Sequence, residues 1–101
     1  MERSRVIATA ANPDGRTVVL DAEGWQHVLD NHPEMAAHQA AVLDTVRRPE
    51  YRRADPRPGR ERYYRLGVGP SRWCFVVVDF NQSPARVVTA LGQRRDPEGW
   101  P

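Results

Sequence analysis

Several features that would place a chain in a familiar class are scarce or missing in these 101 residues. There is no lysine, so all fifteen basic residues are arginines. Cys74 is the only cysteine, which excludes a disulfide framework and a thiolate metal cluster. No apolar run approaches the roughly 20 residues that span a bilayer, and the first residues lack the apolar core and cleavage pattern of a secretory signal. We therefore expect a soluble domain, without membrane contact, in a reducing compartment.

The length limits the chain to a single domain, 1–101, with a modest core, since 40% of its residues are hydrophobic. We expect the core of the domain to cover about residues 17–92. A hairpin at about 5–20 should precede it, and the tail at 93–101 should be loosely held.

The arginines are unevenly distributed, although the formal net charge is only +2. Nine of them lie between Arg47 and Arg72, a segment that contains only three carboxylates, whereas the rest of the chain is acidic. Such a cluster of planar, always-charged, bidentate donors is typical of a surface that binds phosphate or nucleic acid. The alternative is a solvated hairpin in a protein that uses arginine in place of lysine.

The residue pattern predicts an α+β fold. Asn12-Pro13-Asp14-Gly15 is a strong turn signal, Asp21 can cap a helix, and His32-Pro33 should end that helix. The elements expected are a hairpin at 5–20, helices at about 22–31 and 34–47, and strands at about 50–54, 61–66, 73–80 and 86–91. These elements pack most simply as two N-terminal helices on a mainly antiparallel twisted sheet of about four strands, preceded by the short β-hairpin.

The side chains that could carry chemistry do not suggest a metal or another cofactor. The three histidines, His27, His32 and His38, are five and six residues apart. On one helix five residues correspond to roughly 140° of rotation, so the rings do not share a face as a ligand pair would. Cys74 lies among apolar residues, where burial makes a thiol unreactive.

The remaining candidate chemistry is proton transfer beside a phosphate, which requires a base, an acid and a fixed positive charge. His27 and His32 are the candidate acid and base, although each could instead be a structural residue of its helix or helix junction. Alternation along 61–66 places Arg62 and Tyr64 on one face of the strand and Arg65 on the other. Thr89 is a hydroxyl in a row with Val87 and Leu91, and its alternative role is a buried threonine bonded to backbone.

Four short motifs occur in an order and spacing that resemble a known superfamily. They are Trp-x-His-Val-x-x-x-His-Pro-Glu at 25–34, the helix that ends near Pro49, Arg-Tyr-Tyr-Arg at 62–65, and Val-Val-Thr-Ala at 87–90 after an apolar strand. Over about residues 17–92 the chain resembles the phage- and toxin-associated nucleases of the barnase, EndoU, colicin D and RelE-like superfamily.

The resemblance implies a toxin-type, metal-independent endoribonuclease that needs no cofactor and has a helix histidine, a strand arginine and a late-strand Ser or Thr in its site. The matching positions are His27 or His32, Arg62 or Arg65, and Thr89, with Tyr64 as a further donor. The ribose 2′-hydroxyl would attack the adjacent phosphate, which leaves a cyclic phosphate end and restricts cleavage to RNA. Seven arginines would hold the RNA backbone: Arg47, Arg48, Arg52, Arg53, Arg57, Arg60 and Arg72.

The partners implied are RNA, with tRNA a candidate, and an acidic antitoxin or immunity protein. The protein would act in the cytoplasm, either its own or that of a target cell to which a larger effector delivers it. A non-catalytic domain that binds nucleic acid or a partner through the same fold is the alternative. A third possibility is a small-molecule enzyme or a phage accessory protein that uses the fold as a scaffold.

Overall fold

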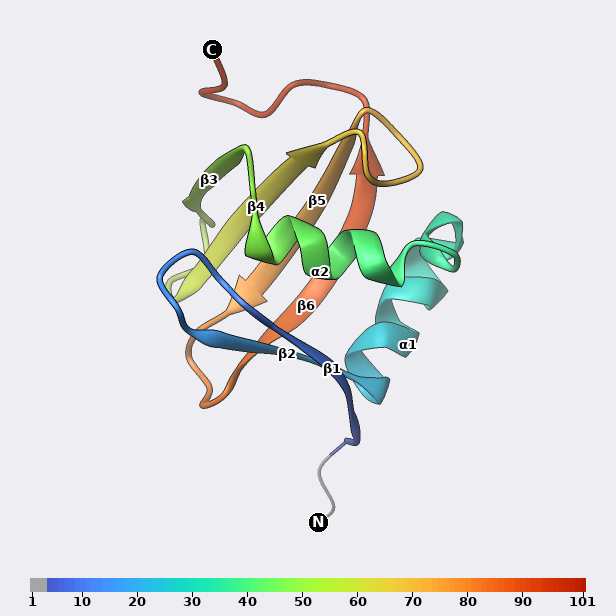
Figure 1. Cartoon of the computed structure of the whole chain (residues 1–101), viewed down its shortest axis with the longest axis vertical. Coiled ribbons are helices and arrows are strands. Elements are labelled where there is room, and N and C mark those ends of the chain that lie inside the picture. Colours follow the sequence, from blue (N-terminus) through green and yellow to red (C-terminus); the bar gives the residue numbers. More distant parts are fainter. Residues whose placement is uncertain (1–3) are drawn as a thin grey trace.

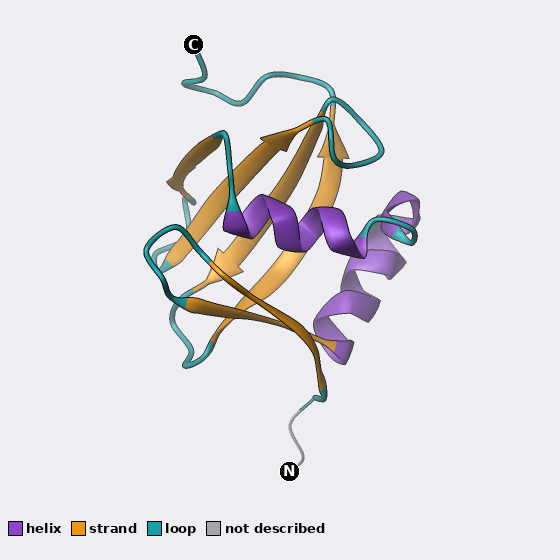
Figure 2. Cartoon of the chain, in the orientation of Figure 1, coloured by secondary structure: helices purple, strands orange, loops and turns teal. Residues whose placement is uncertain are grey.

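Six strands form one mixed sheet in the computed structural model, which describes residues 4–101. The strands are β1 (Val6–Ala11), β2 (Thr17–Asp21), β3 (Tyr51–Ala54), β4 (Arg60–Leu66), β5 (Trp73–Asp79) and β6 (Ala85–Gln93). Their order across the sheet is β1-β2-β6-β5-β4-β3, and only the pair β2 and β6 is parallel (Figures 1 and 2). The predicted arrangement, with two N-terminal helices on a mainly antiparallel sheet of about four strands and a separate hairpin, is therefore wrong.

The hairpin is part of the sheet because its second strand is apolar on both faces. Val18, Val19 and Leu20 are all buried, which is typical of a strand covered on both sides. Val18 lies opposite Ala85, and Val19 opposite Arg86, at the start of β6. The turn chemistry predicts the hairpin itself, but no local pattern indicates that it pairs with the last strand of the chain.

In chain order, the two helices come after β1 and β2 and before the other four strands of the sheet. The first, α1 (Ala22–Asn31), begins as predicted, since the Asp21 carboxylate accepts a hydrogen bond of 2.7 Å from the Gly24 amide. The second, α2, covers Gln39–Arg47 and not the predicted 34–47. A single 3₁₀ turn, η1 (Pro33–Met35), replaces its first part, because the chain turns there to bury the Met35 side chain completely.

The early end of β2 determines where α1 lies. Only two residue pairs join β2 to β6 before the chain leaves the sheet at Asp21, so the rest of that edge of β6 has no neighbouring strand within residues 4–101. The helix α1 lies beside this edge and packs against both β6 and β2 (Figure 1). One side of α1 is therefore next to the sheet face that α2 leaves open.

One face of the sheet is covered by α2, which packs against β5, β1 and β4 (Figure 1). The apolar core lies between them and includes the fully buried side chains Val42, Val46, Tyr63, Val76 and Val78. Strand alternation turns the intervening residues of β4 and β5, among them Arg62, Phe75 and Val77, toward the opposite face. That opposite face carries the candidate site.

The last residues of the chain, for which the sequence predicts a loosely held tail, contact this open face. The Glu98 carbonyl accepts hydrogen bonds from the Tyr51 hydroxyl at 3.1 Å and from Arg53 at 2.8 Å. Trp100 packs edge-on against Trp73, with ring centroids 4.9 Å apart. Pro97 is buried. The tail forms a wall at the end of the sheet where β6 stops.

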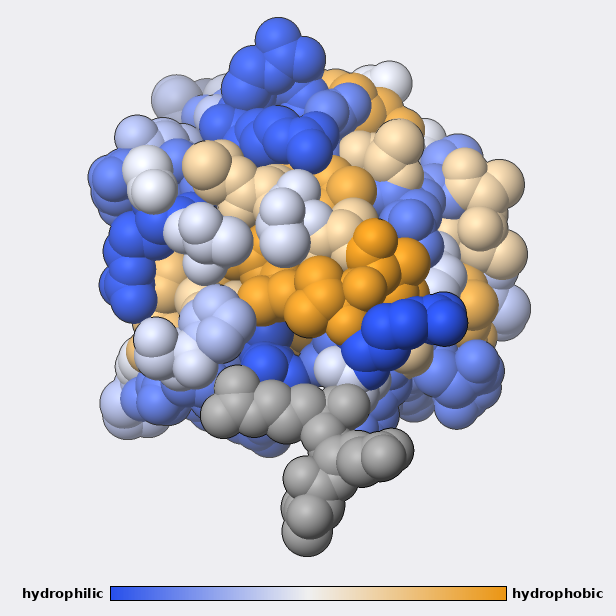
Figure 3. All heavy atoms as spheres, turned by 60° about the horizontal axis from the view of Figure 1, so that its bottom comes forward, coloured by the Kyte–Doolittle hydropathy of each residue, from blue (hydrophilic) through white to orange (hydrophobic). Residues whose placement is uncertain are grey.

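The outer edge of β1 is the free edge of the sheet on the hairpin side. Val6 and Ile7, at the start of this strand, are the large apolar side chains that are exposed among residues 4–101. The lower end of the molecule carries a hydrophobic area bordered by hydrophilic side chains (Figure 3). Within the described residues, no helix has the length and apolar character needed to cross a membrane.

Candidate functional site

A row of side chains crosses three strands on the open face of the sheet. Arg62 of β4 lies opposite Val77 of β5, and Val77 lies opposite Thr89 of β6. All three side chains line one cleft of about 590 Å³, so the strand register sets the cleft's floor. Phe75 adds an apolar ring to the same floor.

A bulge in β6 brings Thr89 into this row. Val78 pairs with Val87, but Val77 pairs with Thr89, so Val88 is an additional residue on β6. Val87 belongs to the core, whereas Val88 and Thr89 line the cleft. The predicted row of Val87, Thr89 and Leu91 on one face is therefore wrong, because strict alternation does not continue through a bulge. The Thr89 side chain is half-buried and lines the cleft.

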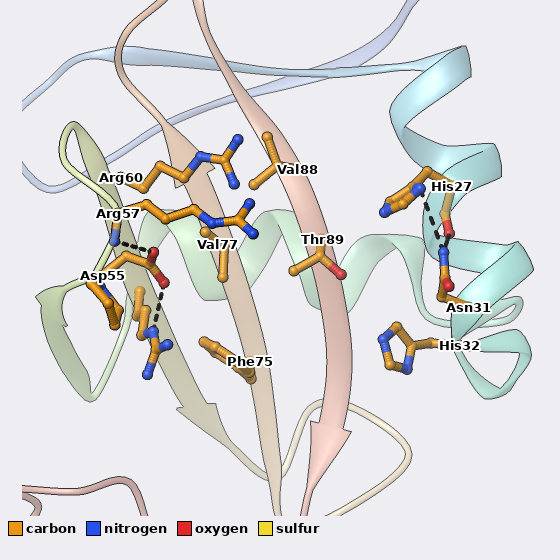
Figure 4. A pocket seen from close by; sticks show the side chains of 12 residues that line it. His27, Asn31, His32, Asp55, Arg57, Arg60, Phe75, Val77, Val88 and Thr89 are labelled. Atoms are coloured by element: carbon orange, nitrogen blue, oxygen red, sulfur yellow. Dashed lines mark hydrogen bonds and ion pairs between the residues drawn. The ribbon is translucent and has the colours of Figure 1, made fainter.

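Both candidate histidines lie on the α1 side of the cleft. His27 lies on α1, and His32 follows its last residue, where the His32 amide donates to the Val28 carbonyl at 2.7 Å. Figure 4 shows the two rings on one side of the cleft, with the Thr89 hydroxyl pointing toward them. His38 lies at the start of α2, outside the cleft.

Each histidine ring has a different neighbour at Nδ1. The Asn31 amide nitrogen lies 3.4 Å from His27 Nδ1 and also donates to the His27 carbonyl at 2.9 Å. That second bond establishes which end of the amide faces the ring, because only its nitrogen can donate to a carbonyl. His32 Nδ1 instead lies 3.7 Å from a carboxylate oxygen of Glu34.

Positive charge enters the cleft from the side opposite the histidines. Arg57 and Arg60 extend toward β6 from the loop before β4 and from its first residue (Figure 4). Neither forms an ion pair with another residue in 4–101. With Arg62 and Asp55 included, the described part of the chain lines the cleft with three arginines and a single carboxylate.

Asp55 holds Arg62 in place and is largely shielded from solvent, with 9% of its side chain exposed. One carboxylate oxygen accepts from Arg62 Nε at 2.7 Å, and the other accepts from the Arg57 amide at 2.9 Å. Burial by itself would raise the pKa of Asp55, but these hydrogen bonds and the nearby arginines hold it below its usual range. Because Asp55 binds Nε, the terminal nitrogens of Arg62 keep donors for a ligand.

Two predicted catalytic residues lie elsewhere. Arg65 is on the covered side of β4, where it donates to the Arg48 carbonyl and pairs with Glu50. Tyr64 is on the same face as Arg62, but it is only 3% exposed and its ring stacks on Phe75 at 4.8 Å. Neither side chain lines the cleft.

The predicted arginine surface is largely neutralised by carboxylates, some from within the segment and some from outside it. Six of the nine arginines between 47 and 72 form ion pairs: Arg47 with Asp44, Arg52 with Asp14 and Glu61, Arg53 with Glu98, Arg62 with Asp55, Arg65 with Glu50, and Arg72 with Asp96. Of the seven arginines predicted to hold RNA, Arg57 and Arg60 line the cleft. Arg47, Arg48, Arg52, Arg53 and Arg72 do not.

Sequence reasoning missed Asn31 and Asp55, and both had a local signal. Asn31 follows His27 by four residues, the spacing that brings side chains together on a helix. Asp55 begins a Pro/Gly-rich loop, where an acidic side chain readily accepts from backbone amides. Within residues 4–101, no three His, Cys, Asp or Glu side chains are grouped so that they could hold a metal ion. Cys74 is buried, and burial raises the pKa of its thiol.

Comparison with known proteins found no family model, no curated protein and no solved structure that matches this chain. The resemblance to the nuclease superfamily therefore stays a prediction from short motifs, and the function has to be argued from the cleft itself.

Proposed function

We propose that this protein is a small, metal-independent endoribonuclease of toxin type. The observation that supports the proposal is the composition of one cleft, where His27, His32, Arg62 and Thr89 come together from separate elements. Arg57 and Arg60 bring unpaired positive charge to the same cleft. A phosphate between the histidines and the arginines would meet an acid, a base and charge stabilisation at once.

His32 is the better candidate for the general base. The Glu34 carboxylate beside Nδ1 can only accept a hydrogen bond, so it favours the tautomer with the proton on Nδ1. Nε2 then has a free lone pair for the ribose 2′-hydroxyl proton. The separation of 3.7 Å is long for a hydrogen bond, but such contacts often shorten only when substrate is bound.

His27 is the better candidate for the general acid. The Asn31 amide donates toward His27 Nδ1, so the proton of a neutral ring lies on Nε2, which then cannot act as a base. The Nε2 proton can pass to the departing oxygen once the ring is an imidazolium, with both nitrogens protonated, and a bound phosphate anion favours that form. We therefore assign the two histidines different catalytic roles, because different side chains lie beside their Nδ1 atoms.

The proposed reaction forms a bond between the 2′-oxygen and phosphorus and breaks the bond between phosphorus and the 5′-oxygen. His32 receives the 2′-hydroxyl proton, and His27 supplies the proton that the 5′-oxygen takes up. Arg62, with Asp55 fixing its Nε, stabilises the extra negative charge on the pentacoordinate phosphorus, and the Thr89 hydroxyl donates to one of its oxygens. The products are a 2′,3′-cyclic phosphate and a free 5′-hydroxyl, and DNA cannot react.

The test is incubation of the purified protein with total tRNA, with a DNA control and a chelator, followed by analysis of the new ends. The proposal expects RNA cleavage that leaves cyclic phosphate ends and is lost in His27→Ala and His32→Ala. Arg65→Gln should cleave normally, since Arg65 lies outside the cleft. Cleavage of DNA, or hydrolysis to a linear phosphate as the first product, would contradict the mechanism.

One observation favours a second candidate, a non-catalytic domain that binds nucleic acid or a partner through the same cleft. Within residues 4–101, no hydrogen bond joins either histidine to Arg62 or to Thr89, so the four side chains are not yet connected. In that case His27→Ala and His32→Ala would leave RNA affinity almost unchanged. An acidic antitoxin or immunity protein could also occupy the cleft, where carboxylates would meet Arg57 and Arg60.

A further inference from the structure

A second hollow, of about 670 Å³, lies on the same open face of the sheet and shares Arg62 with the first cleft. Its other side chains come from β3, from Tyr64 of β4, and from residues 93–98. The two hollows therefore adjoin at Arg62, and a ligand that extends beyond the first cleft past Arg62 enters the second.

Two arginines of the second hollow are free to bind a ligand. Arg94 and Arg95 are exposed, and neither forms an ion pair with another residue in 4–101. The two carboxylates nearby are already engaged. Asp96 accepts from Arg72 at 2.9 Å and from the Trp73 indole at 3.0 Å, while Glu98 pairs with Arg53.

Arg53 can also become available. Its ion pair with Glu98 has an N–O separation of 3.8 Å, and the Glu98 side chain is 90% exposed. Solvent-exposed pairs of this kind contribute little to stability, so a phosphate can replace the carboxylate. When the Glu98 carboxylate is replaced, the hydrogen bond from Arg53 to the Glu98 backbone carbonyl, at 2.8 Å, still holds the guanidinium in position.

The wall that carries Arg94 and Arg95 is fixed to the sheet on its far side. Trp100 packs on Trp73, and the Tyr51 hydroxyl donates to the Glu98 carbonyl. At Gly99, φ is +87°, and a Cβ there would overlap the Tyr51 hydroxyl, so the close approach requires glycine. Arg94 and Arg95 are thus presented by an anchored segment.

We propose that the second hollow binds a backbone phosphate of a single RNA strand, next to the phosphate that is cleaved in the first. Arg94 and Arg95 supply the main contacts, and Arg62 lies between the two phosphates. This inference rests on the proposed function. Planar guanidinium groups match the geometry of phosphate oxygens. As a ligand for several converging arginines, a phosphodiester is therefore better suited than a single carboxylate.

The hollow binds the backbone without reading the base. Tyr64, the aromatic side chain that lines it, is only 3% exposed and already stacked on Phe75, so it has no face free for a base. The site therefore increases affinity for longer strands with little sequence preference.

The test compares Arg94→Gln/Arg95→Gln with a control that removes the same charge, Arg5→Gln/Arg16→Gln in the N-terminal hairpin. Both arginines of the control are exposed, and neither lines either hollow. With an RNA dinucleotide, which has one phosphate, the Arg94/Arg95 variant should match the wild type. With an octanucleotide, its kcat/KM should fall about tenfold or more, while the control stays within about twofold. Equal losses on both substrates would overturn the inference.

A binding experiment distinguishes a failure of this inference from a failure of the proposed function. The probe is a labelled 2′-deoxy octanucleotide, which cannot be cleaved, titrated by fluorescence anisotropy at several salt concentrations. The slope of log K against log salt should become shallower in the Arg94/Arg95 variant, by about 0.7 for each phosphate that the variant no longer neutralises. An unchanged slope, or the same change in the control, overturns the second site whether or not RNA is cut. Failure of the wild type to cleave any RNA refutes only the nuclease.

Discussion

Replacing Asp55 with asparagine should slow cleavage and tighten RNA binding at the same time. The carboxylate accepts from Arg62 Nε at 2.7 Å and from the Arg57 amide at 2.9 Å. Asparagine keeps an oxygen that accepts a hydrogen bond from the charged Arg62 guanidinium, but it removes the negative charge and with it the ion-pair part of the interaction. Because Arg62 is partly exposed, that part is worth about 1 kcal/mol, which is the loss in positioning energy.

This loss should appear in the chemical step. If this full amount is lost from the transition state, kcat falls about fivefold to tenfold, because 1.4 kcal/mol corresponds to a factor of ten. Binding changes in the opposite direction. Within residues 4–101, Asp55 is the only carboxylate that lines the first cleft, so its neutralisation leaves three arginines unopposed and raises the affinity for uncleavable RNA.

The assay is single-turnover cleavage of a defined RNA together with anisotropy of its 2′-deoxy analogue. The matched control is Asp44→Asn, which removes the carboxylate of another arginine pair, that of Arg47, outside the cleft. The control should leave both quantities unchanged. A parallel fall of kcat and affinity in Asp55→Asn would refute the reasoning, since it would mean that the cleft collapses when Asp55 is altered.

Two further predictions follow from buried side chains. Burial raises the pKa of Tyr63 to about 12, so its hydroxyl stabilises the fold below about pH 10 and this effect disappears as the pH rises to about 12; Tyr63→Phe should flatten this part of the urea-unfolding profile by up to about 2 kcal/mol. Asp79 accepts from the Asn81 amide and from the Asn81 and Gln82 side chains, and these bonds lower its pKa; Asp79→Ala should cost about 1–3 kcal/mol at neutral pH, and the gap from the wild type should shrink as the pH falls below about 4.

The local sequence pattern predicts correctly those parts of the site that lie within a single helix or strand. The cap at Asp21 and the break at Pro33 predict the limits of α1, and with them the places of His27 and His32. Alternation in β4 separates Arg62 from Arg65 correctly. It does not say which of the two faces is open, because that depends on where α2 packs, and α2 comes from a different part of the chain.

Thr89 shows where a periodic pattern stops being informative. The valines that precede it are consistent with unbroken alternation, which would place Thr89 beside Val87 in the core. The bulge at Val88 reverses this and turns the hydroxyl into the cleft. A bulge depends on how β5 and β6 pair across the sheet, so no residue of β6 alone reveals it.

The arginine cluster shows that charge counted along the sequence also fails to predict contacts made across the fold. Counted along the chain, the segment from 47 to 72 has a large positive excess, but Asp14, Asp44, Asp96 and Glu98, which lie outside the segment, pair with four of its arginines. Among the arginines that line the two hollows, those without an ion pair within residues 4–101 are therefore Arg57 and Arg60 in one and Arg94 and Arg95 in the other. Only the first pair belongs to the segment that composition singles out. If RNA is the ligand, its path is set by the arginines that folding leaves without a carboxylate, and these cannot be identified until the sheet topology is known.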